Sequence, residues 1–134
     1  MTQFASTRIF TDDVDGLIHF YETVTGIEAN RLHPLFGELA TPLGTLAIAS
    51  TRTVGLLGDG AAVAAANRSV SLDFLVEDVD ALVPGLRESV KEFISVPTDL
   101  PWGNRSLLFR DPDGNLVNFF TPTTPDARQR FGLS

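Results

Sequence analysis

The sequence predicts an α+β fold built from two copies of one βαβββ module, and two internal matches support this. Residues 6–17 align with residues 71–82 at a constant offset of 65, with five of twelve positions identical. Pro42-Leu-Gly44 then aligns with Pro112-Asp-Gly114 at an offset of 70. Both turns stand between apolar runs, as hairpin turns do. Two copies of so long a period indicate a duplicated supersecondary unit rather than a solenoid.

In the first copy, residues 8–11 are expected to form a strand and a helix is expected to run to about Thr25. Asp12 or Asp13 would cap the first backbone N–H groups of this helix, and Gly26 suits the left-handed position after its last turn. The apolar residues of the helix recur with helical period, which predicts a buried stripe of Val14, Leu17, Ile18, Tyr21 and Val24. Three strands are expected to follow, at residues 28–32, 36–40 and 45–50.

The second copy predicts a strand at residues 71–76 and a helix at about 79–93, in which Pro84 should kink or delay the helix because proline lacks a backbone donor. Further strands are expected near Ser95 and at residues 106–109 and 116–121. The whole chain, 1–134, is then one domain in four parts. These are module one at about 4–50, a Gly- and Ala-rich connection at 51–68, module two at about 69–122 and a weakly periodic tail at 123–134.

The composition excludes several classes of function. The chain has 10 basic and 17 acidic residues, a net charge of −7, which argues against binding nucleic acid. It has no run of about 18 apolar residues, so no membrane span and no membrane partner are expected. No signal peptide is visible, and the lack of cysteine excludes thiolate chemistry and fits a cytoplasmic protein. Two histidines cannot supply a site with three histidine ligands.

Two segments resemble a known family. The first copy has a strand, then Asp-Val-Asp at residues 13–15, then Phe20-Tyr21 before Gly26. The second has Pro-Trp-Gly at residues 101–103 followed by Arg-Asp-Pro-Asp-Gly-Asn at 110–115. Over residues 4–122 the chain is similar to the vicinal oxygen chelate superfamily, which includes glyoxalase I, extradiol dioxygenases, and fosfomycin and bleomycin resistance proteins. The second segment is most similar to the bleomycin-resistance-like members.

The resemblance implies that the two modules form a cupped mixed sheet with the helices outside and the ligand or metal inside. Many members are homodimers, and some bury the site between chains. In the family's enzymes, metal ligands come from the first and last strands of each module, positions that here map to Ser6, Ile48, Ser71 and Asn118. None of these is His, Asp or Glu, the donors that a divalent metal needs. We therefore expect no metal and no cofactor.

The ligand-binding residues expected in the cup include Trp102, which either fills the core as a lid or stacks on the ligand. Arg8 and Asp73 are related by the repeat. They either form a structural salt bridge across the pseudo-twofold axis, or one or both bind a polar ligand. Phe120 shares strand parity with Asn118 and hence a face of the sheet. The full predicted set is Trp102, Asn118, Phe120, Phe36, Arg8, Asp73, Ser6 and Ser71.

No catalytic residue is assigned. His19 is expected on the solvent side of its helix, and His33 in a loop, with a cavity-wall base or ligand as the alternative. Asp111 and Asp113 are interpreted as turn formers because Asp, Pro, Gly and Asn each suit a turn position.

Three functions compete. The favoured one is a metal-free small-molecule binder, which sequesters a cationic aromatic antibiotic or metabolite. The resemblance to the family implies a homodimer. The alternative is a metal-dependent glyoxalase-type lyase or extradiol-type dioxygenase with displaced ligands. The third is a cofactor-free isomerase or hydrolase with Asp73, Glu38 or His33 as base, for which no paired nucleophile is evident.

Overall fold

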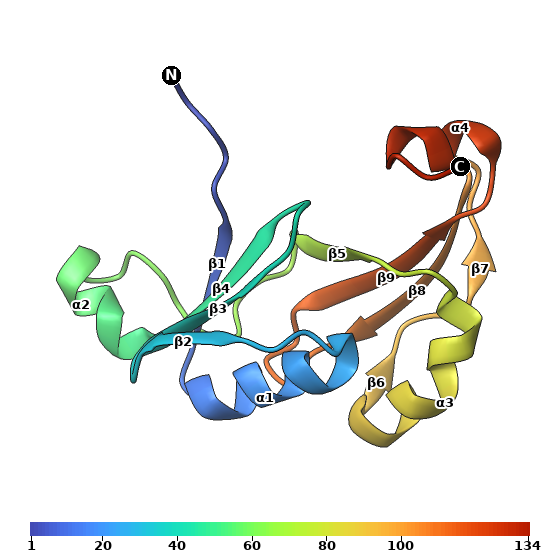
Figure 1. Cartoon of the computed structure of the whole chain (residues 1–134). Coiled ribbons are helices and arrows are strands. Elements are labelled where there is room, and N and C mark those ends of the chain that lie inside the picture. The colour runs from blue at the N-terminus through green and yellow to red at the C-terminus, as the bar shows by residue number, and fades with distance from the viewer. The chain divides into compact units, whose positions relative to one another are not determined.

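The computed structural model describes all residues from 1 to 134, and the chain divides into two compact units, Met1–Asn67 and Arg68–Ser134 (Figure 1). None of its helices combines the length and apolar character that crossing a membrane requires. We describe each unit by itself. Unit 1 contains β1 (Thr7–Thr11), α1 (Val14–Thr25), β2 (Asn30–His33), β3 (Phe36–Ala40), β4 (Thr45–Ser50), the 3-10 turn η1 (Thr51–Thr53) and α2 (Val54–Leu57).

Unit 2 repeats the first five of these elements and adds a short strand, β7, and a C-terminal helix. It contains β5 (Ser71–Leu75), α3 (Val79–Ser89), β6 (Glu92–Phe93), β7 (Thr98–Asp99), β8 (Asn104–Arg110), β9 (Leu116–Pro122) and α4 (Pro125–Arg130). The sheet of unit 1 has the order β1-β4-β3-β2, and that of unit 2 has the order β5-β9-β8-β6, with β7 also pairing with β8. In each sheet the first strand lies parallel to the last and the other pairings are antiparallel. The predicted α+β fold of two repeated modules with mixed sheets is therefore confirmed.

The two long helices begin at the acidic residues that the sequence singles out. Asp13 accepts a hydrogen bond from the Gly16 backbone N–H at 2.9 Å, and Asp78 accepts one from the Ala81 N–H at 3.4 Å. These carboxylates partner backbone donors that the first turn of a helix leaves free. The left-handed residue after α1 is Gly26, with φ of 72°, as predicted.

The predicted boundaries fail in three places. α3 passes through Pro84 without a break but ends at Ser89, and residues 92–93 form the short strand β6 instead of its last turn. The single strand expected near Ser95 is replaced by β6 and β7, which flank that residue. The connection and the tail contain η1, α2 and α4, three short elements whose apolar periodicity is too brief to be seen in sequence.

Each helix buries its apolar stripe against one face of its own sheet. In unit 1 the fully buried side chains include Leu17 and Tyr21 of α1 and Ile48 of β4. In unit 2 the centre is aromatic, with Phe109 and Phe119 packed edge to face at a centroid distance of 5.1 Å. This packing leaves the opposite face of each sheet available for polar side chains.

Candidate ligand-binding face

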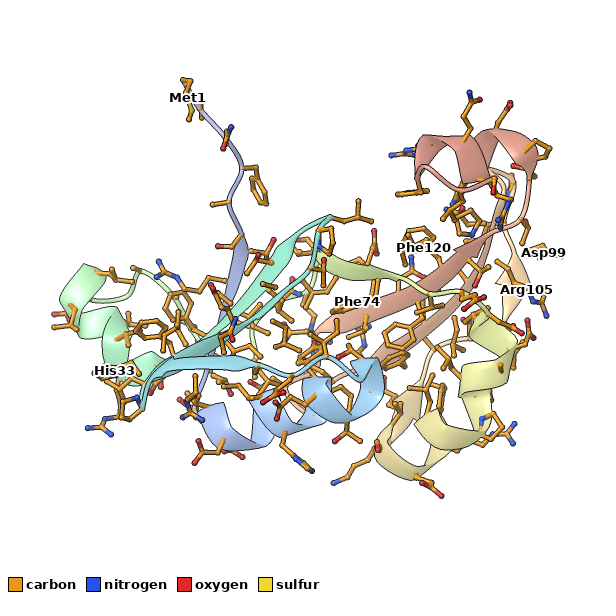
Figure 2. All side chains as sticks on the ribbon, in the orientation of Figure 1. Met1, His33, Phe74, Asp99, Arg105 and Phe120 are labelled. Carbon is orange, nitrogen blue, oxygen red and sulfur yellow. The ribbon has the colours of Figure 1, made fainter.

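The sheet of unit 2 has one face against α3 and another that points away from it, which we call the distal face. The guanidinium of Arg105, in β8, contacts Asp80 of α3, so the odd-numbered side chains of β8 point toward the helix (Figure 2). Successive side chains of a strand alternate between faces, so the even-numbered ones point away. The register carries the alternation to β9 and β5. The polar and aromatic side chains that β5, β8 and β9 place on the distal face are Ser71, Asp73, Asn104, Ser106, Arg110, Asn118 and Phe120, and Arg110 is paired with Glu92 of β6.

Three of the predicted ligand-binding residues lie together on this face. Asp73 of β5 is directly opposite Asn118 of β9, which in turn is opposite Leu108 of β8. The Ser71 hydroxyl donates a hydrogen bond to the Asp73 Oδ1 at 2.7 Å and so holds the carboxylate along the strand. Asp73 is exposed, which leaves its second oxygen available to a ligand.

The distal face also carries buried polar atoms that have no partner. They are the Oδ1 atoms of Asn104 and Asn118 and the Oγ atom of Ser106. The Ser106 residue as a whole is only 1% exposed. A buried polar group without a hydrogen bond costs about 1–3 kcal/mol. Three such atoms on one face of two adjacent strands are therefore an expensive arrangement for the chain alone.

Asn104 and Ser106 are not among the ligand-binding residues predicted from the sequence. The strand had been expected to begin at residue 106, whereas β8 begins at Asn104. The signal that was available is the alternation itself, because polar residues at 104, 106 and 118 share a face once β8 and β9 are paired through the hairpin turn at Pro112.

The ring of Phe120 belongs to the distal face but is not open to solvent. It is 6% exposed, and the Phe131 ring, just after α4, packs on it at a centroid distance of 5.2 Å. Arg128 links the two ends of this C-terminal segment, since its guanidinium donates hydrogen bonds to the backbone oxygens of Ser134 at 2.7 Å and Pro122 at 3.4 Å. Figure 1 shows α4 at the end of the sheet where β9 finishes and β8 begins.

Trp102 does not fill the core. Its side chain is 67% exposed in the loop that precedes β8. The loop is closed by a hydrogen bond from Leu100 N to Asn104 O at 2.8 Å, and it turns at Gly103, which has a φ of 93°. A side chain at Gly103 would meet Thr124 and Ala127, so glycine lets the loop approach the C-terminal segment. The lid interpretation is therefore wrong, and stacking on a ligand stays a prediction.

The corresponding face of unit 1, which points away from α1, has a different character. Arg8 and Glu38 flank Ala47 on one rung of the sheet, and Phe10 and Phe36 flank Ala49 on the next. The guanidinium of Arg8 lies over the ring of Phe10, at 5.3 Å from its centroid.

His33 and Phe36 are neighbours at the exposed edge of unit 1. Their rings stack at 5.7 Å with an interplanar angle of 8°, and the Nδ1 of His33 accepts a hydrogen bond from the Leu35 N–H at 3.0 Å. His33 ends β2 and is exposed, as is the predicted ligand residue Ser6, which precedes β1. Arg8 and Asp73 each have a partner within their own unit, so the salt bridge suggested by the repeat stays a prediction.

The position mapped to Ile48 needs correction. Ile48 is fully buried and pairs with Gly37, whose face packs on Ile18 of α1. The residue of β4 that lies opposite Arg8, as Asn118 lies opposite Asp73, is Ala47. The segment from the turn glycine to this rung is one residue longer in unit 2 than in unit 1, and the alignment of the two turns does not include this difference. A shift of one residue along a strand exchanges its faces.

The residues at these positions do not fit the family's divalent metal. Unit 1 offers a methyl group, a serine hydroxyl and the guanidinium of Arg8 with one carboxylate, Glu38, on the same rung, and unit 2 offers one carboxylate, Asp73, with an amide and a hydroxyl. No group of three His, Cys, Asp or Glu side chains that could hold a metal ion occurs in the chain. We derive no chemical step through a metal.

The acidic residues outside this face have structural roles. Asp111 is 4% exposed, and its Oδ1 accepts hydrogen bonds from the backbone N–H groups of Asp113 and Asn115, both at 2.9 Å, while its Oδ2 accepts one from the Asn115 side chain at 2.8 Å. The predicted turn between β8 and β9 is thereby confirmed. His19 is exposed on α1, also as predicted.

One ion pair on the helix side of unit 2 shifts a pKa. Arg105 contacts Asp80 at 2.6 Å and Asp99 at 3.3 Å (Figure 2). The hydrogen bond from Arg105 lowers the pKa of Asp80 below its ordinary value of 3.8. The same two carboxylates raise the pKa of Arg105, which stays charged at all accessible pH.

A match to one family model shows the superfamily to which the chain belongs. The model of the Glyoxalase family, described as the Glyoxalase/Bleomycin resistance protein/Dioxygenase superfamily, matches residues 3–119, which is most of the chain. The chain belongs to this superfamily. Among the curated proteins, none matches the chain.

Solved structures share the fold, and two of the following three are named as members of the superfamily. A glyoxalase/bleomycin resistance protein/dioxygenase from Nocardioides is 22% identical with a TM-score of 0.73, covering 93% of this chain and 86% of its own. A family enzyme from Burkholderia phytofirmans PsJN is 21% identical with a TM-score of 0.78, covering 88% and 97%. A protein of unknown function from Agrobacterium tumefaciens str. C58 is 24% identical with a TM-score of 0.78, covering 90% and 94%. Identities this low establish the shared fold, and function must come from the site.

Proposed function

We propose that the protein binds a small organic molecule on the distal face of unit 2, without a resident metal, and prefers a flat ring that carries a positive charge. The observation that carries this proposal is the pair of Asp73 and Asn118. An exposed carboxylate lies opposite an amide whose buried oxygen has no partner, on the face of the sheet that α3 does not cover. Binding alone is the function, since no base and nucleophile are paired there.

Charge and shape support a cationic ring. The chain carries a net charge of −7, which raises the local concentration of cations around it. Asp73 provides a specific anionic contact for such a cation, because its carboxylate is exposed and is held in place by the Ser71 hydroxyl. The exposed indole of Trp102 can stack on a flat cation, an arrangement stabilised by the ring quadrupole. A cationic aromatic antibiotic or metabolite has these properties.

The experiment titrates N-methylacridinium, a flat cation without hydrogen-bond donors, into tag-free protein by calorimetry. We expect saturable binding with one site, weakened about tenfold in Asp73→Asn because the only charge contact is lost. Glu77→Gln is the control, since it removes the same charge from the turn after β5, and its affinity should stay within twofold of the parent. Equal affinity in Asp73→Asn and the parent would refute a site built on Asp73.

A second arm tests the metal-dependent alternative. Mn²⁺, Ni²⁺ and Zn²⁺ are added singly to tag-free protein while the melting temperature is recorded. A ligand that binds only the folded state at a hundredfold excess over its Kd stabilises by about 2.7 kcal/mol, a shift that is easily seen. We expect no such shift. A shift abolished by Asp73→Asn would replace the binder with a metal-dependent lyase or dioxygenase.

We also propose that the chain forms a homodimer. Unit 1 exposes large apolar side chains, among them Phe4 at 88%, Leu56 at 84% and Val63 at 71%. The chain has a mass of 14.5 kDa, so light scattering during gel filtration separates one copy from two without ambiguity. A single-copy mass at concentrations up to about 100 μM would refute the dimer as a functional state, since such a Kd corresponds to only about 5.5 kcal/mol of association free energy.

A further inference from the structure

We propose that Asn104, Ser106 and Asn118 form a hydrogen-bonding subsite on the distal face of unit 2 that takes an uncharged polar edge of the ligand, such as a ring N–H. This inference rests on the proposed function and deepens it. Asp73 recognises charge, and the three-residue subsite recognises the neutral part of the same molecule.

The geometry of the two strands brings these residues together. Asn104 and Ser106 are alternate residues of β8, so their side chains lie on one face about 7 Å apart along the strand. Ser106 is directly opposite Phe120 of β9, and Asn118 is two residues before Phe120 on the same face. Ser106 and Asn118 are thus diagonal neighbours, about 7–8 Å apart, and Asn104 lies one step further along β8 on the other side of Ser106, so one elongated ligand can span the three.

The serine is the residue for which the chain offers no structural role. On its other side Ser106 faces Thr98 of β7, but the Thr98 hydroxyl donates to the Val96 carbonyl oxygen at 2.7 Å. The Ser106 Oγ therefore has no partner on either neighbouring strand, and the side chain is too buried for bulk water to serve. A hydroxyl kept in such a place lowers the stability of the free protein unless a bound molecule partners it.

The C-terminal segment governs access to this subsite. Phe131 covers Phe120, the residue opposite Ser106, so its ring must move before a flat ligand can reach the serine. The segment after Pro122 contains only the short helix α4, so the displaced structure is small. We infer that the ring of the ligand replaces the ring of Phe131 on Phe120 as its polar edge meets Ser106.

Ser106→Ala tests the inference because it predicts opposite changes in stability and affinity. Removing an unpartnered buried hydroxyl should raise the melting temperature of the free protein by about 2–5 °C. The same variant should bind acridone, a flat neutral molecule with a ring N–H and a carbonyl, about fivefold to tenfold more weakly. Binding of N-methylacridinium, which has no such edge, should change less than twofold.

Ser95→Ala is the matched control. Ser95 is a half-buried serine of unit 2 whose Oγ, unlike that of Ser106, has a partner, because it accepts a hydrogen bond from the Leu108 N–H at 3.0 Å. Its loss should lower the melting temperature and leave the affinity for acridone unchanged. The parent protein should also bind acridone more tightly than N-methylacridone, which lacks the N–H group.

Each remaining outcome contradicts the subsite. If Ser106→Ala lowers the melting temperature and leaves acridone binding intact, the hydroxyl is a structural group. If neither quantity changes, an ordered water partners the hydroxyl and the ligand does not. Acridone that binds like its N-methyl analogue, or not at all, overturns the subsite even where N-methylacridinium still depends on Asp73. If N-methylacridinium binds equally well without the Asp73 carboxylate, the charge site is refuted. The Ser106→Ala result then still decides whether the subsite exists.

Discussion

Asp73 lies directly opposite Asn118 in the parallel pair of β5 and β9, and at the equivalent rung of unit 1 Arg8 lies opposite Ala47. The fold therefore presents the same backbone rung twice with different chemistry, a carboxylate and an amide in one unit and a guanidinium and a methyl group in the other. The proposed binding of a cationic ring depends on the first of these rungs.

Trp102→Ala should weaken binding of N-methylacridinium by about 1–3 kcal/mol without unfolding the protein. The indole is 67% exposed, so little packing is lost with it. Leu43→Ala is the control, because Leu43 is an equally exposed loop residue of unit 1. Calorimetry gives both affinities. In the parent protein the emission of this single tryptophan should be quenched by the ligand, and a drop in melting temperature with unchanged affinity would assign Trp102 a packing role.

Phe131→Ala should release the C-terminal segment. The Phe131 ring covers Phe120, and Arg128 and Arg130 lie in the short helix that precedes it. Loss of the ring should speed limited trypsin cleavage at these arginines several-fold, because cleavage follows the population of the opened segment. Mass spectrometry of the fragments measures the rate at each site. Cleavage at Arg128 and Arg130 that is as slow as in the parent would mean that Phe131 does not hold the segment down.

Asp111→Ala should lower the free energy of unfolding by about 2–4 kcal/mol, since three hydrogen bonds to a buried carboxylate are lost. The repeat supplies a control in Thr41, whose exposed hydroxyl closes the corresponding turn of unit 1 through Gly44. Thr41→Ala should cost less than about 1 kcal/mol. Urea titration compares the two, and equal losses would show that the second turn gains nothing from burial.

Asp80→Asn should lower the melting temperature near neutral pH but not in acid. Arg105 lowers the pKa of Asp80 in the folded protein, so the ion pair stabilises the fold above the ordinary pKa of 3.8. That contribution is lost as pH falls through the lowered pKa, where the parent carboxyl also becomes neutral. Melting curves of both proteins should therefore begin to converge only as the pH falls below the ordinary pKa of 3.8, and should meet below the lowered pKa of Asp80. The longer contact from Arg105 to Asp99, at 3.3 Å, predicts a smaller effect for Asp99→Asn.

Sequence patterns predicted the fold well because both local signals and the repeat pointed to it. Asp13, Asp78 and Gly26 mark helix ends through their own backbone hydrogen bonds or conformation, and these depend on few distant residues. The short elements α2 and α4 were missed because they are too brief to show a period. Tertiary contacts, such as that of Phe131 with Phe120, hold α4 in place.

The candidate site was harder to predict than the fold. Asn118 and Asp73 share a face as expected, but Ile48 was assigned to the wrong one, because a single residue in a hairpin loop decides strand register. Ser106 carried no signal of its own, since a serine in a strand is unremarkable until its neighbours are known. Its lack of a partner is a property of the assembled sheet that no local pattern contains.

The contrast between Arg8 and Asp73 bears on how the duplicated chain evolved. After a duplication both halves present the same surface, and a change at one rung alters one half alone. With a cation on one copy and an anion on the other, the halves are no longer interchangeable. An artificial tandem of two second halves would carry an aspartate at both of these rungs and an arginine at neither. Divergence at one repeated position has thus given the two halves different chemistry at the same rung.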